Sequence, residues 1–267
     1  MGQGYILATG ADEVKRLQIL NSLYGPGTEQ FLQRAGLQAG MRVVEIGCGT
    51  GNMSCWLARQ VGANGSVIGV DVSPAQVEQA RLQAEAFGLT NVSFAVADAY
   101  APGLPLESFD LVYCRLVLMH LTHPLDALKQ MLALLQSGGR LVCEEMDLSQ
   151  WFAVPDNDAF RRVQAFNLLL SDRRGQHFRL GTGLYQLFLQ LGLSQPQISF
   201  SLPAARQGEE KRLMELSFAQ FAPILIEEGL ATVAEIEAIL LALKQFNEDP
   251  TTLQGMPVAG QVWAIKP

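Results

Sequence analysis

The sequence has few cysteines, no long apolar run and a deficit of positive charge, and each shortage excludes a class of protein. Its 267 residues include four cysteines, and no two of them form a CxxC pair. A disulfide framework or a structural zinc site needs cysteines in such paired positions, so we expect neither disulfides nor a metal. A chain without disulfides fits a reducing, cytoplasmic compartment.

Long apolar runs are missing as well. No stretch reaches the roughly 18 uninterrupted apolar residues that a membrane-spanning helix needs. The amino terminus does not show a basic segment followed by an apolar one, which is the pattern of a secretion signal. We therefore expect a cytoplasmic chain with no membrane insertion, present as a monomer or a homodimer.

Positive charge is in deficit, with 19 lysines and arginines against 26 aspartates and glutamates and a formal net charge of −7. Such a chain repels a phosphate backbone and gains little from counterion release, so nucleic acid is not an expected partner. The arginine-rich stretch 161–179 also contains Asp172, and we interpret it as solvated helix faces.

What the sequence does contain, from Met41 onward, is an alternation of short apolar runs with longer segments of helical periodicity. This alternation predicts βαβ units and a parallel sheet. Most of the runs are continuously apolar, as expected where helices cover both faces of a sheet. Strands are predicted at Arg42–Ile46, Ser66–Val70, Val92–Val96, Phe109–Cys114 and Arg140–Glu144.

Helix boundaries are marked most clearly after the second strand. Ser73 is a good N-cap, Pro74 suits the first helical position, and Gln76 completes a capping-box pattern. Gly88 then suits the left-handed conformation that ends many helices. A helix is therefore predicted from Pro74 to about Phe87.

The later part of the chain predicts a cap. Beyond Glu145 the alternation stops, helical segments dominate, and two further strand-like runs bring the sheet to seven strands. The expected fold is α/β: a Rossmann-like, seven-stranded, mostly parallel sheet with helices on both faces and a helical cap. The expected organisation is a helical leader or lid at 1–40, a cofactor-binding half at 41–147, helical cap insertions at 148–178 and 204–257, a core helix and strand at 179–203, and a last core strand at 258–267.

A glycine-rich turn follows the first strand, and residues 45–51 read EIGCGTG. Glycines permit the positive φ angles of a tight strand-to-helix turn and let a ligand approach the main chain closely. Dinucleotide-binding enzymes use a related turn with the spacing GxGxxG, whereas here the spacing is GxGxG and Asn52 stands where their third glycine would fall. The turn alone leaves both classes of cofactor open.

Two carboxylates follow the next two strands. Asp71 lies 20 residues after Gly51, where a carboxylate accepts hydrogen bonds from both hydroxyls of a ribose. Asp98 follows the third strand, where it can accept a hydrogen bond from the exocyclic amine of adenine. Alternatively, both are ordinary turn residues, because aspartate is common where a chain leaves a sheet.

Together these motifs resemble those of class I S-adenosylmethionine-dependent methyltransferases, in particular the ubiquinone/menaquinone-type and small-molecule group. The resemblance covers Met41 to Asp147. The glycine-rich turn resembles the family's first motif, Asp71-Val72-Ser73 its second and Asp98-Ala99 its third. The segments 109–112 and 134–141 resemble its fourth strand and the turn before its fifth.

The resemblance implies roles for individual residues. Gly47 and Gly49 would line the methionine part of the cofactor, and Glu45 would orient the turn and the cofactor's ammonium group. Asp71 would bind the ribose, and Asp98 the adenine amine. The complete set of expected cofactor-binding residues, of which the leader contributes the first two, is Tyr5, Arg16, Glu45, Gly47, Cys48, Gly49, Asn52, Asp71, Val72, Gln76, Asp98, Ala99 and Arg115.

The candidates for catalysis are Arg115, His120 and Glu144. Arg115 and His120 follow the fourth strand, and Glu144 ends the fifth, where ligands gather in open α/β sheets. His120, Glu144 or His177 would serve as the base for an acceptor that must lose a proton, whereas a free amine needs none. In the alternative, Arg115 pairs with a structural carboxylate and His120 packs or caps. One of Glu144, Glu145 and Asp147 is expected to face the acceptor.

The expected function is direct in-line methyl transfer from S-adenosylmethionine to a small, partly apolar molecule. Two alternatives stay open: an NAD(P)-dependent oxidoreductase, which shares the fold and the strand-end acid, and a non-catalytic S-adenosylmethionine-binding module. The aromatic residues of the insertions would line the acceptor pocket or form the core of the cap: Phe152, Phe160, Phe166, Phe178, Phe218 and Phe221.

Overall fold

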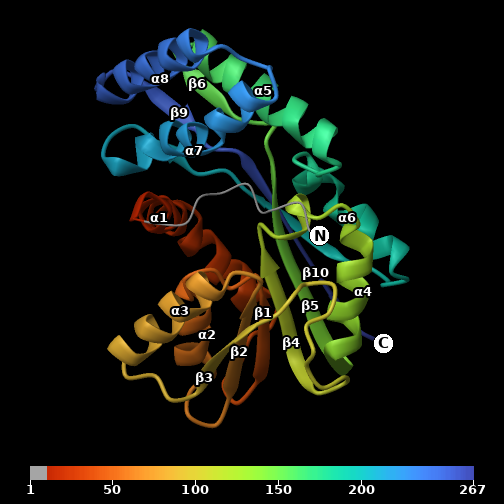
Figure 1. The fold of residues 1–267 in the computed structure, drawn as a ribbon. Coiled ribbons are helices and arrows are strands. Elements are labelled where there is room, and N and C mark those ends of the chain that lie inside the picture. Colours follow the sequence, from red (N-terminus) through yellow and green to blue (C-terminus); the bar gives the residue numbers. More distant parts are fainter. Residues whose placement is uncertain (1–10) are drawn as a thin grey trace.

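The computed structural model describes residues 11–267, which form a sheet with helices on both faces and a cap beyond one end of the strands (Figure 1). The sheet has seven strands in the order β3-β2-β1-β4-β5-β10-β7. β1 to β5 run parallel, and β10 runs antiparallel to both of its neighbours, so the predicted Rossmann-like, mostly parallel sheet is confirmed. The bounds are β1 Arg42–Ile46, β2 Ser66–Asp71, β3 Val92–Val96, β4 Phe109–Arg115, β5 Leu135–Asp147, β7 Gln197–Ser201 and β10 Val258–Ile265.

Helices cover both faces of this sheet, with α2 and α3 on one side and α4 and α6 on the other (Figure 1). Their bounds are α2 Asn52–Val61, α3 Pro74–Ala86, α4 Pro124–Leu134 and α6 Leu180–Gln190. The predicted N-cap Ser73 and the glycine that follows α3 are confirmed. The Ser73 hydroxyl accepts a hydrogen bond from the backbone N–H of Gln76 at 3.4 Å, and Gly88 has a φ of +63°.

β5 is longer than predicted, because it begins at Leu135 rather than at Arg140. Gly138 and Gly139 predicted a turn before the strand. In the structure the N–H of Gly138 donates to the carbonyl of Lys266 at 2.9 Å, and the N–H of Lys266 donates to the carbonyl of Gly139 at 2.8 Å. The end of the chain thus pairs with both glycines and extends the strand.

The order of the strands reverses between β1 and β4. β2 and β3 lie on one side of β1, whereas β4 and β5 lie on the other. Loops that leave the carboxyl ends of β1 and β4 therefore diverge and open a crevice, the usual ligand site of open α/β sheets. The glycine-rich turn leaves β1 at this point, and Arg115 ends β4 beside it.

The cap combines helices with a small antiparallel sheet of the order β6-β9-β8. Its elements are β6 Phe152–Val154, α5 Asp158–Arg174, β8 Ala204–Ala205, α7 Leu213–Glu227, α8 Val233–Glu248 and β9 Leu253–Gly255. The sequence did not predict these three short strands, because strands of two or three residues leave no periodic pattern in a sequence.

Most of the phenylalanines of the insertions are packed inside the cap. The ring centroids of Phe160 and Phe246 lie 4.8 Å apart, and those of Phe218 and Phe221 lie 5.2 Å apart. Phe152 differs, because 43% of its surface is exposed. These aromatic contacts supply much of the apolar core that holds α5, α7 and α8 together.

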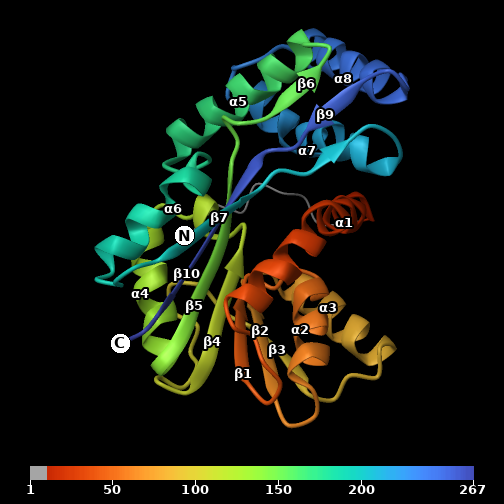
Figure 2. The same ribbon diagram turned by 180° about the vertical axis from the view of Figure 1, so that it is seen from behind.

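Helix α1 (Ala11–Arg34) lies between the sheet and the cap in both views (Figures 1 and 2). The ammonium of Lys15 lies 2.7 Å from Glu209, in the 3-10 helix η2 (Glu209–Arg212) that precedes α7. The Tyr24 hydroxyl donates to the carbonyl of Pro257 at 2.7 Å. α1 is thus fixed to the cap on one side.

Among residues 11–267, no helix combines the length and apolar character needed to cross a membrane.

Candidate functional site

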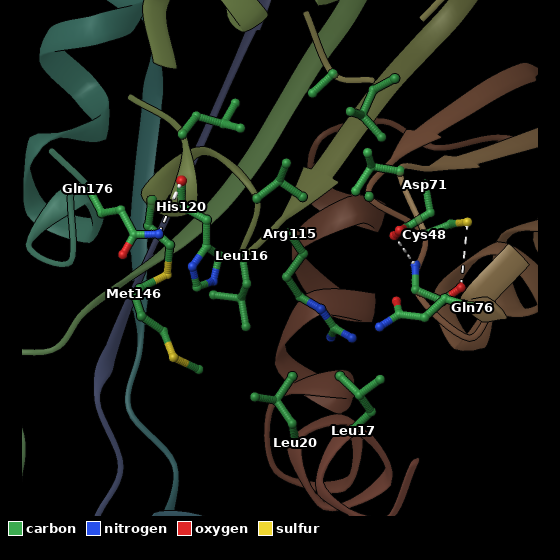
Figure 3. Close-up of a pocket in the computed structure, with 18 of the residues that line it drawn as sticks. Leu17, Leu20, Cys48, Asp71, Gln76, Arg115, Leu116, His120, Met146 and Gln176 are labelled. Carbon is green, nitrogen blue, oxygen red and sulfur yellow. Dashed lines mark hydrogen bonds between the residues drawn. The ribbon is translucent and has the colours of Figure 1, made fainter. Parts of the chain in front are cut away.

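A cavity of about 730 Å³ lies between the carboxyl ends of the strands, α1 and the cap. Its volume is within the range typical of small-molecule sites. Figure 3 shows Asp71, Cys48 and Gln76 at one end of the cavity, His120 and Met146 at the other, with Leu17 and Leu20 of α1 along one wall.

The expected cofactor-binding residues come together in this cavity. Tyr5 lies outside the described residues. The other members of the set line the cavity: Arg16, Glu45, Gly47, Cys48, Gly49, Asn52, Asp71, Val72, Gln76, Asp98, Ala99 and Arg115. The spacing of the motifs thus correctly predicted that these residues lie together.

The glycine-rich turn is shaped by close contacts as well as by backbone angles. Gly47 has a φ of +72°, and a Cβ there would lie 2.2 Å from a methyl carbon of Val117. The N–H of Gly47 donates to the carbonyl of Val70 at 2.7 Å, which ties the turn to β2. Only a residue without a side chain fits this position.

Asp71 links the turn to the second strand. Its two carboxylate oxygens accept hydrogen bonds from the N–H groups of Gly49 and Ser73, each at 2.9 Å. Burial raises the pKa of this carboxyl, while the hydrogen bonds from the backbone oppose the rise. Each oxygen keeps a further lone pair for a ligand hydroxyl. Beside it, Val72 presents an apolar surface that is 58% exposed.

Glu45 lies deeper, at the end of β1. It is buried, and its carboxylate accepts a hydrogen bond from the Ser54 hydroxyl. Burial raises the pKa of Glu45 to about 7, and the positive charge of Arg115 partly offsets that rise. A bound cation near this carboxyl would favour its ionised form.

Arg115 is held by α1, and among the described residues its guanidinium contacts no carboxylate directly. Its guanidinium donates to the Thr28 hydroxyl at 3.2 Å and to the Asn21 side-chain oxygen at 3.1 Å. The Thr28 hydroxyl in turn donates to Glu144 at 2.9 Å. Arg115 therefore connects the leader helix to the ends of β4 and β5.

Glu144 was predicted to act as a base near the acceptor, and the structure places it outside the cavity wall. It is buried, it does not line the cavity, and it accepts hydrogen bonds from Thr28 and from the side-chain amide of Gln261 at 3.0 Å. Successive side chains of a strand point to opposite faces, and Glu144 points to the face covered by α1. Through the Thr28 hydroxyl, its carboxylate helps to hold the Arg115 side chain in place.

His120 lies in the cavity wall, in the 3-10 helix η1 (Leu118–His120). Its ring makes an edge contact with Phe178, with the ring centroids 5.5 Å apart. The low-polarity surroundings, and next the positive charge of Arg16, lower the pKa of His120 to about 4. The imidazole is therefore neutral at pH 7 and able to accept a proton.

Glu145 fixes the segment that carries His120. Its buried carboxylate accepts hydrogen bonds from the consecutive N–H groups of Val117, Leu118 and Met119, at 3.0, 2.8 and 3.2 Å. Burial raises the pKa of Glu145 to about 8, against the effect of these donors. Glu145 thus supports η1, and it does not line the cavity.

Sequence reasoning missed most of the wall opposite the glycine-rich turn. This wall combines residues of η1, β5, α5, α7 and the loops between them, so no local pattern marks it. Its apolar members are Met119, Leu121, Met146, Leu148, Leu170, Phe178, Leu213, Met214 and Phe221, and its polar members include Asn167, Gln176 and Ser217.

Comparison with known proteins identifies the family. Residues 37–178, more than half of the chain, match the model of a protein family that is described as a methyltransferase domain. The chain belongs to this methyltransferase family. It is also similar to the methyltransferase GfsG of Streptomyces halstedii, with 33% identity over 229 residues that cover 82% of this chain and 76% of GfsG.

A further relative and a solved structure are also similar to this chain. The aklanonic acid methyltransferase DauC of Streptomyces sp. (strain C5) is 41% identical over 102 residues, or 38% of this methyltransferase, and the match spans 46% of DauC, less than half of its length. The crystal structure of YcgJ from Bacillus subtilis superposes with a TM-score of 0.59 at 19% identity, covering 89% of this chain and 97% of YcgJ, which shows a shared fold.

These matches confirm the predicted class, an S-adenosylmethionine-dependent methyltransferase with that cofactor. They favour neither the oxidoreductase nor the non-catalytic alternative.

We expect His120 to make the stability of this methyltransferase depend on pH between about 6.5 and 4. Because its pKa falls from 6.5 to about 4 on folding, the unfolded chain takes up the proton first, and the folded state loses stability as the pH falls through this window. The loss should be about 2 kcal/mol, less than the full shift implies, because the ring borders a cavity that admits water.

Urea unfolding at pH 7 and pH 4.5 of the wild type and of His120→Gln measures this loss. The free energy of unfolding of His120→Gln should fall less between pH 7 and pH 4.5 than that of the wild type. His123→Gln, at an exposed position, should behave as the wild type does. Equal pH sensitivity of His120→Gln and wild type would contradict the assignment.

Proposed function

We propose that this methyltransferase transfers the methyl group of S-adenosylmethionine to a small, partly apolar molecule held under the cap. The observation that carries this proposal is the continuity of the cavity, which runs from the glycine-rich turn to an apolar wall made by η1, α5 and α7. The name of the relative DauC, which acts on aklanonic acid, supports a small-molecule acceptor.

The residues at the turn fit the cofactor. The Gly47 backbone has no room for a side chain, so main chain forms the floor of the site. Asp71 has lone pairs for the ribose hydroxyls, and the exposed face of Val72 suits the adenine ring. Asp98 accepts a hydrogen bond from the N–H of Tyr100 at 2.9 Å and keeps acceptor capacity for the adenine amine. When bound, S-adenosylmethionine supplies an electrophilic methyl group.

The chain's own residues would then bind, orient and deprotonate the acceptor. His120, neutral and held by Glu145 through η1, serves as the general base. Arg115 borders the cavity between the two ends and is held in place through Thr28 by Glu144, so Glu144 is a positioning residue. The apolar wall excludes water from the reacting groups.

We further propose that the segments 148–178 and 204–257 act as the cap over the acceptor and that the leader, with α1, closes the side of the site. The net charge of −7 supports a small molecule rather than a nucleic acid as the acceptor. The four cysteines are buried free thiols, which supports a reducing, cytoplasmic setting.

Replacing Asp71 with asparagine is expected to raise the Kd for S-adenosylhomocysteine by about 30- to 100-fold. The asparagine amide keeps one acceptor oxygen but loses the negative charge and the second acceptor oxygen. It therefore cannot accept hydrogen bonds from the N–H groups of both Gly49 and Ser73 and still bind the ribose. Calorimetric titration of both proteins with S-adenosylhomocysteine measures this effect. Asp126→Asn, at an exposed position in α4, is the matched control. An unchanged Kd for Asp71→Asn, or a wild type that binds no S-adenosylhomocysteine, would refute the proposal.

A further inference from the structure

Two uncharged polar side chains of the cap line the cavity without a hydrogen-bond partner in the part of the chain that the structure describes. They are Asn167 of α5 and Ser217 of α7. The rings of Phe166 and Phe218 stack with their centroids 6.4 Å apart, so α5 and α7 meet at the residues next to this pair. The two polar groups thus lie on neighbouring helices in a wall that is otherwise mostly apolar.

Asn167 occupies a position that the periodicity of α5 assigns to an apolar residue. It is only 7% exposed and lies four residues after Val163 and three before Leu170, both of which are buried. Asparagine is a poorer helix former than leucine, and an amide left without a partner costs about 1 to 3 kcal/mol. Packing of the cap therefore favours an apolar residue here and does not account for the asparagine.

The other polar residue in the buried stripe of α5 is bound within the chain. The Ser171 hydroxyl donates to the carbonyl of Gln176 at 2.8 Å and accepts from the N–H of Phe178 at 3.0 Å, and Ser171 does not line the cavity. Asn167 differs in both respects. It lines the cavity, and neither its side-chain oxygen nor its nitrogen is sealed from solvent. A bound molecule can therefore reach the Asn167 amide.

Ser217 presents its hydroxyl in the same way. It lies along α7 between Met214 and Phe221, which also line the cavity. A serine within a helix often donates to the carbonyl four residues before it. Ser217 makes no such hydrogen bond to Leu213, nor any other within residues 11–267. Its hydroxyl can therefore donate to a ligand or accept from one.

The cap contributes no charge to the cavity. An ionic group bound against the cap would lose its hydration without gaining a counter-charge from these segments, whereas a neutral group loses less and is satisfied by an amide or a hydroxyl. The lining residues from segments 148–178 and 204–257 are all uncharged: Leu148, Asn167, Leu170, Gln176, Phe178, Leu213, Met214, Ser217, Phe221 and Pro257.

We propose that Asn167 and Ser217 form a specificity subsite for a neutral oxygen group, a carbonyl or a hydroxyl, on the apolar body of the acceptor. This group is distinct from the atom that is methylated, and it lies against the cap. An acceptor without it would displace water from the Asn167 amide and leave the amide unpaired. The inference rests on the proposed function, because it concerns the acceptor of the same site.

Binding of three matched probes to the protein saturated with S-adenosylhomocysteine tests the inference. 2-Ethylnaphthalene, 2-acetylnaphthalene and 1-(2-naphthyl)ethanol share one apolar body and nearly one shape, but only the last two carry a neutral oxygen. Equilibrium dialysis gives each Kd. The oxygen preference is the Kd of the ethyl probe divided by that of the tighter oxygenated probe. Asn167→Leu should lower it by about 10-fold, and Ser217→Ala by about fivefold.

Ser171→Ala is the matched control for Ser217→Ala, because it makes the same change in a serine that is bound within the chain. It should lower the Tm, since it breaks two hydrogen bonds, and it should change the oxygen preference by less than about twofold. The Asn167 variants should not lower the Tm, because they break no hydrogen bond within residues 11–267. Asn167→Ala, which adds no volume, should lose the oxygen preference as Asn167→Leu does.

The outcomes separate this inference from the proposed function. Failure of the wild type to bind S-adenosylhomocysteine would refute the proposed function. Normal binding of S-adenosylhomocysteine, with an oxygen preference that both Asn167 variants retain, would overturn the subsite alone. A Tm lowered in both Asn167 variants would show a structural role for the amide and would also overturn the subsite. A preference lost in the Asn167 variants but kept in Ser217→Ala would overturn the part of Ser217.

Discussion

Replacing His120 with glutamine is expected to lower kcat by about 100- to 10,000-fold, the usual contribution of a general base. Glutamine retains hydrogen-bonding capacity at about the same size but cannot accept the proton of the acceptor. The affinity for S-adenosylhomocysteine should change by less than about threefold, because the ring lies at the far end of the cavity from Asp71 (Figure 3). Transfer of labelled methyl groups to the best acceptor in a panel of naphthols and naphthoic acids measures kcat.

The matched control for this variant is His123→Gln, which makes the same chemical change three residues further on. His123 is exposed, is not part of the cavity wall and only precedes α4, so its replacement should leave kcat unchanged. An acidic acceptor that is methylated equally fast by His120→Gln and by wild type would show that His120 is not the base.

Replacing Gly260 with alanine is expected to lower the free energy of unfolding by at least about 3 kcal/mol. A Cβ at Gly260 would lie 1.8 Å from the carbonyl oxygen of Gly181 and 2.6 Å from its carbonyl carbon. Both obstacles are backbone atoms, so α6 and β10 would have to move apart. Because β10 pairs with β5, the movement would also disturb the strand that carries Glu144 and Glu145.

Gly183→Ala is the matched control, because Gly183 lies in the same helix, α6. A Cβ there has one neighbouring atom within 4 Å, at 3.9 Å, and its φ is not in the positive region. Alanine at this position should stabilise the protein by about 0.5 to 1 kcal/mol through its better helix propensity. Urea unfolding of both variants measures the two effects, and Gly260→Ala with wild-type stability would contradict the close contact.

Two consecutive residues near the carboxyl end of β5 support two different parts of the site. Glu144 holds Arg115 and α1 through Thr28, while the next residue, Glu145, holds η1 and with it His120. Adjacent strand residues point to opposite faces, so two consecutive carboxylates can order the two sides of the cavity. These two acids do not line the cavity, and they instead support Arg115 and His120, which do.

The sequence by itself determined the cofactor end of the site. β1 and β3 have the predicted bounds, Ser73 caps α3, and the turn, Asp71 and Asp98 lie together as their spacing indicates. These features are local: each is a strand, a turn or a cap set by a few consecutive residues, and the parallel order of the strands then brings their carboxyl ends to one edge.

Only the tertiary structure decided the acceptor end. Strand register decides that Glu144 points toward α1 and Glu145 toward η1. In the small sheet of the cap, β6 pairs with β9, about a hundred residues further along the chain. The wall that holds His120, Met146 and Asn167 collects residues from η1, β5 and α5. Contacts between distant segments leave no periodic or local pattern, because they arise from packing after the elements have formed.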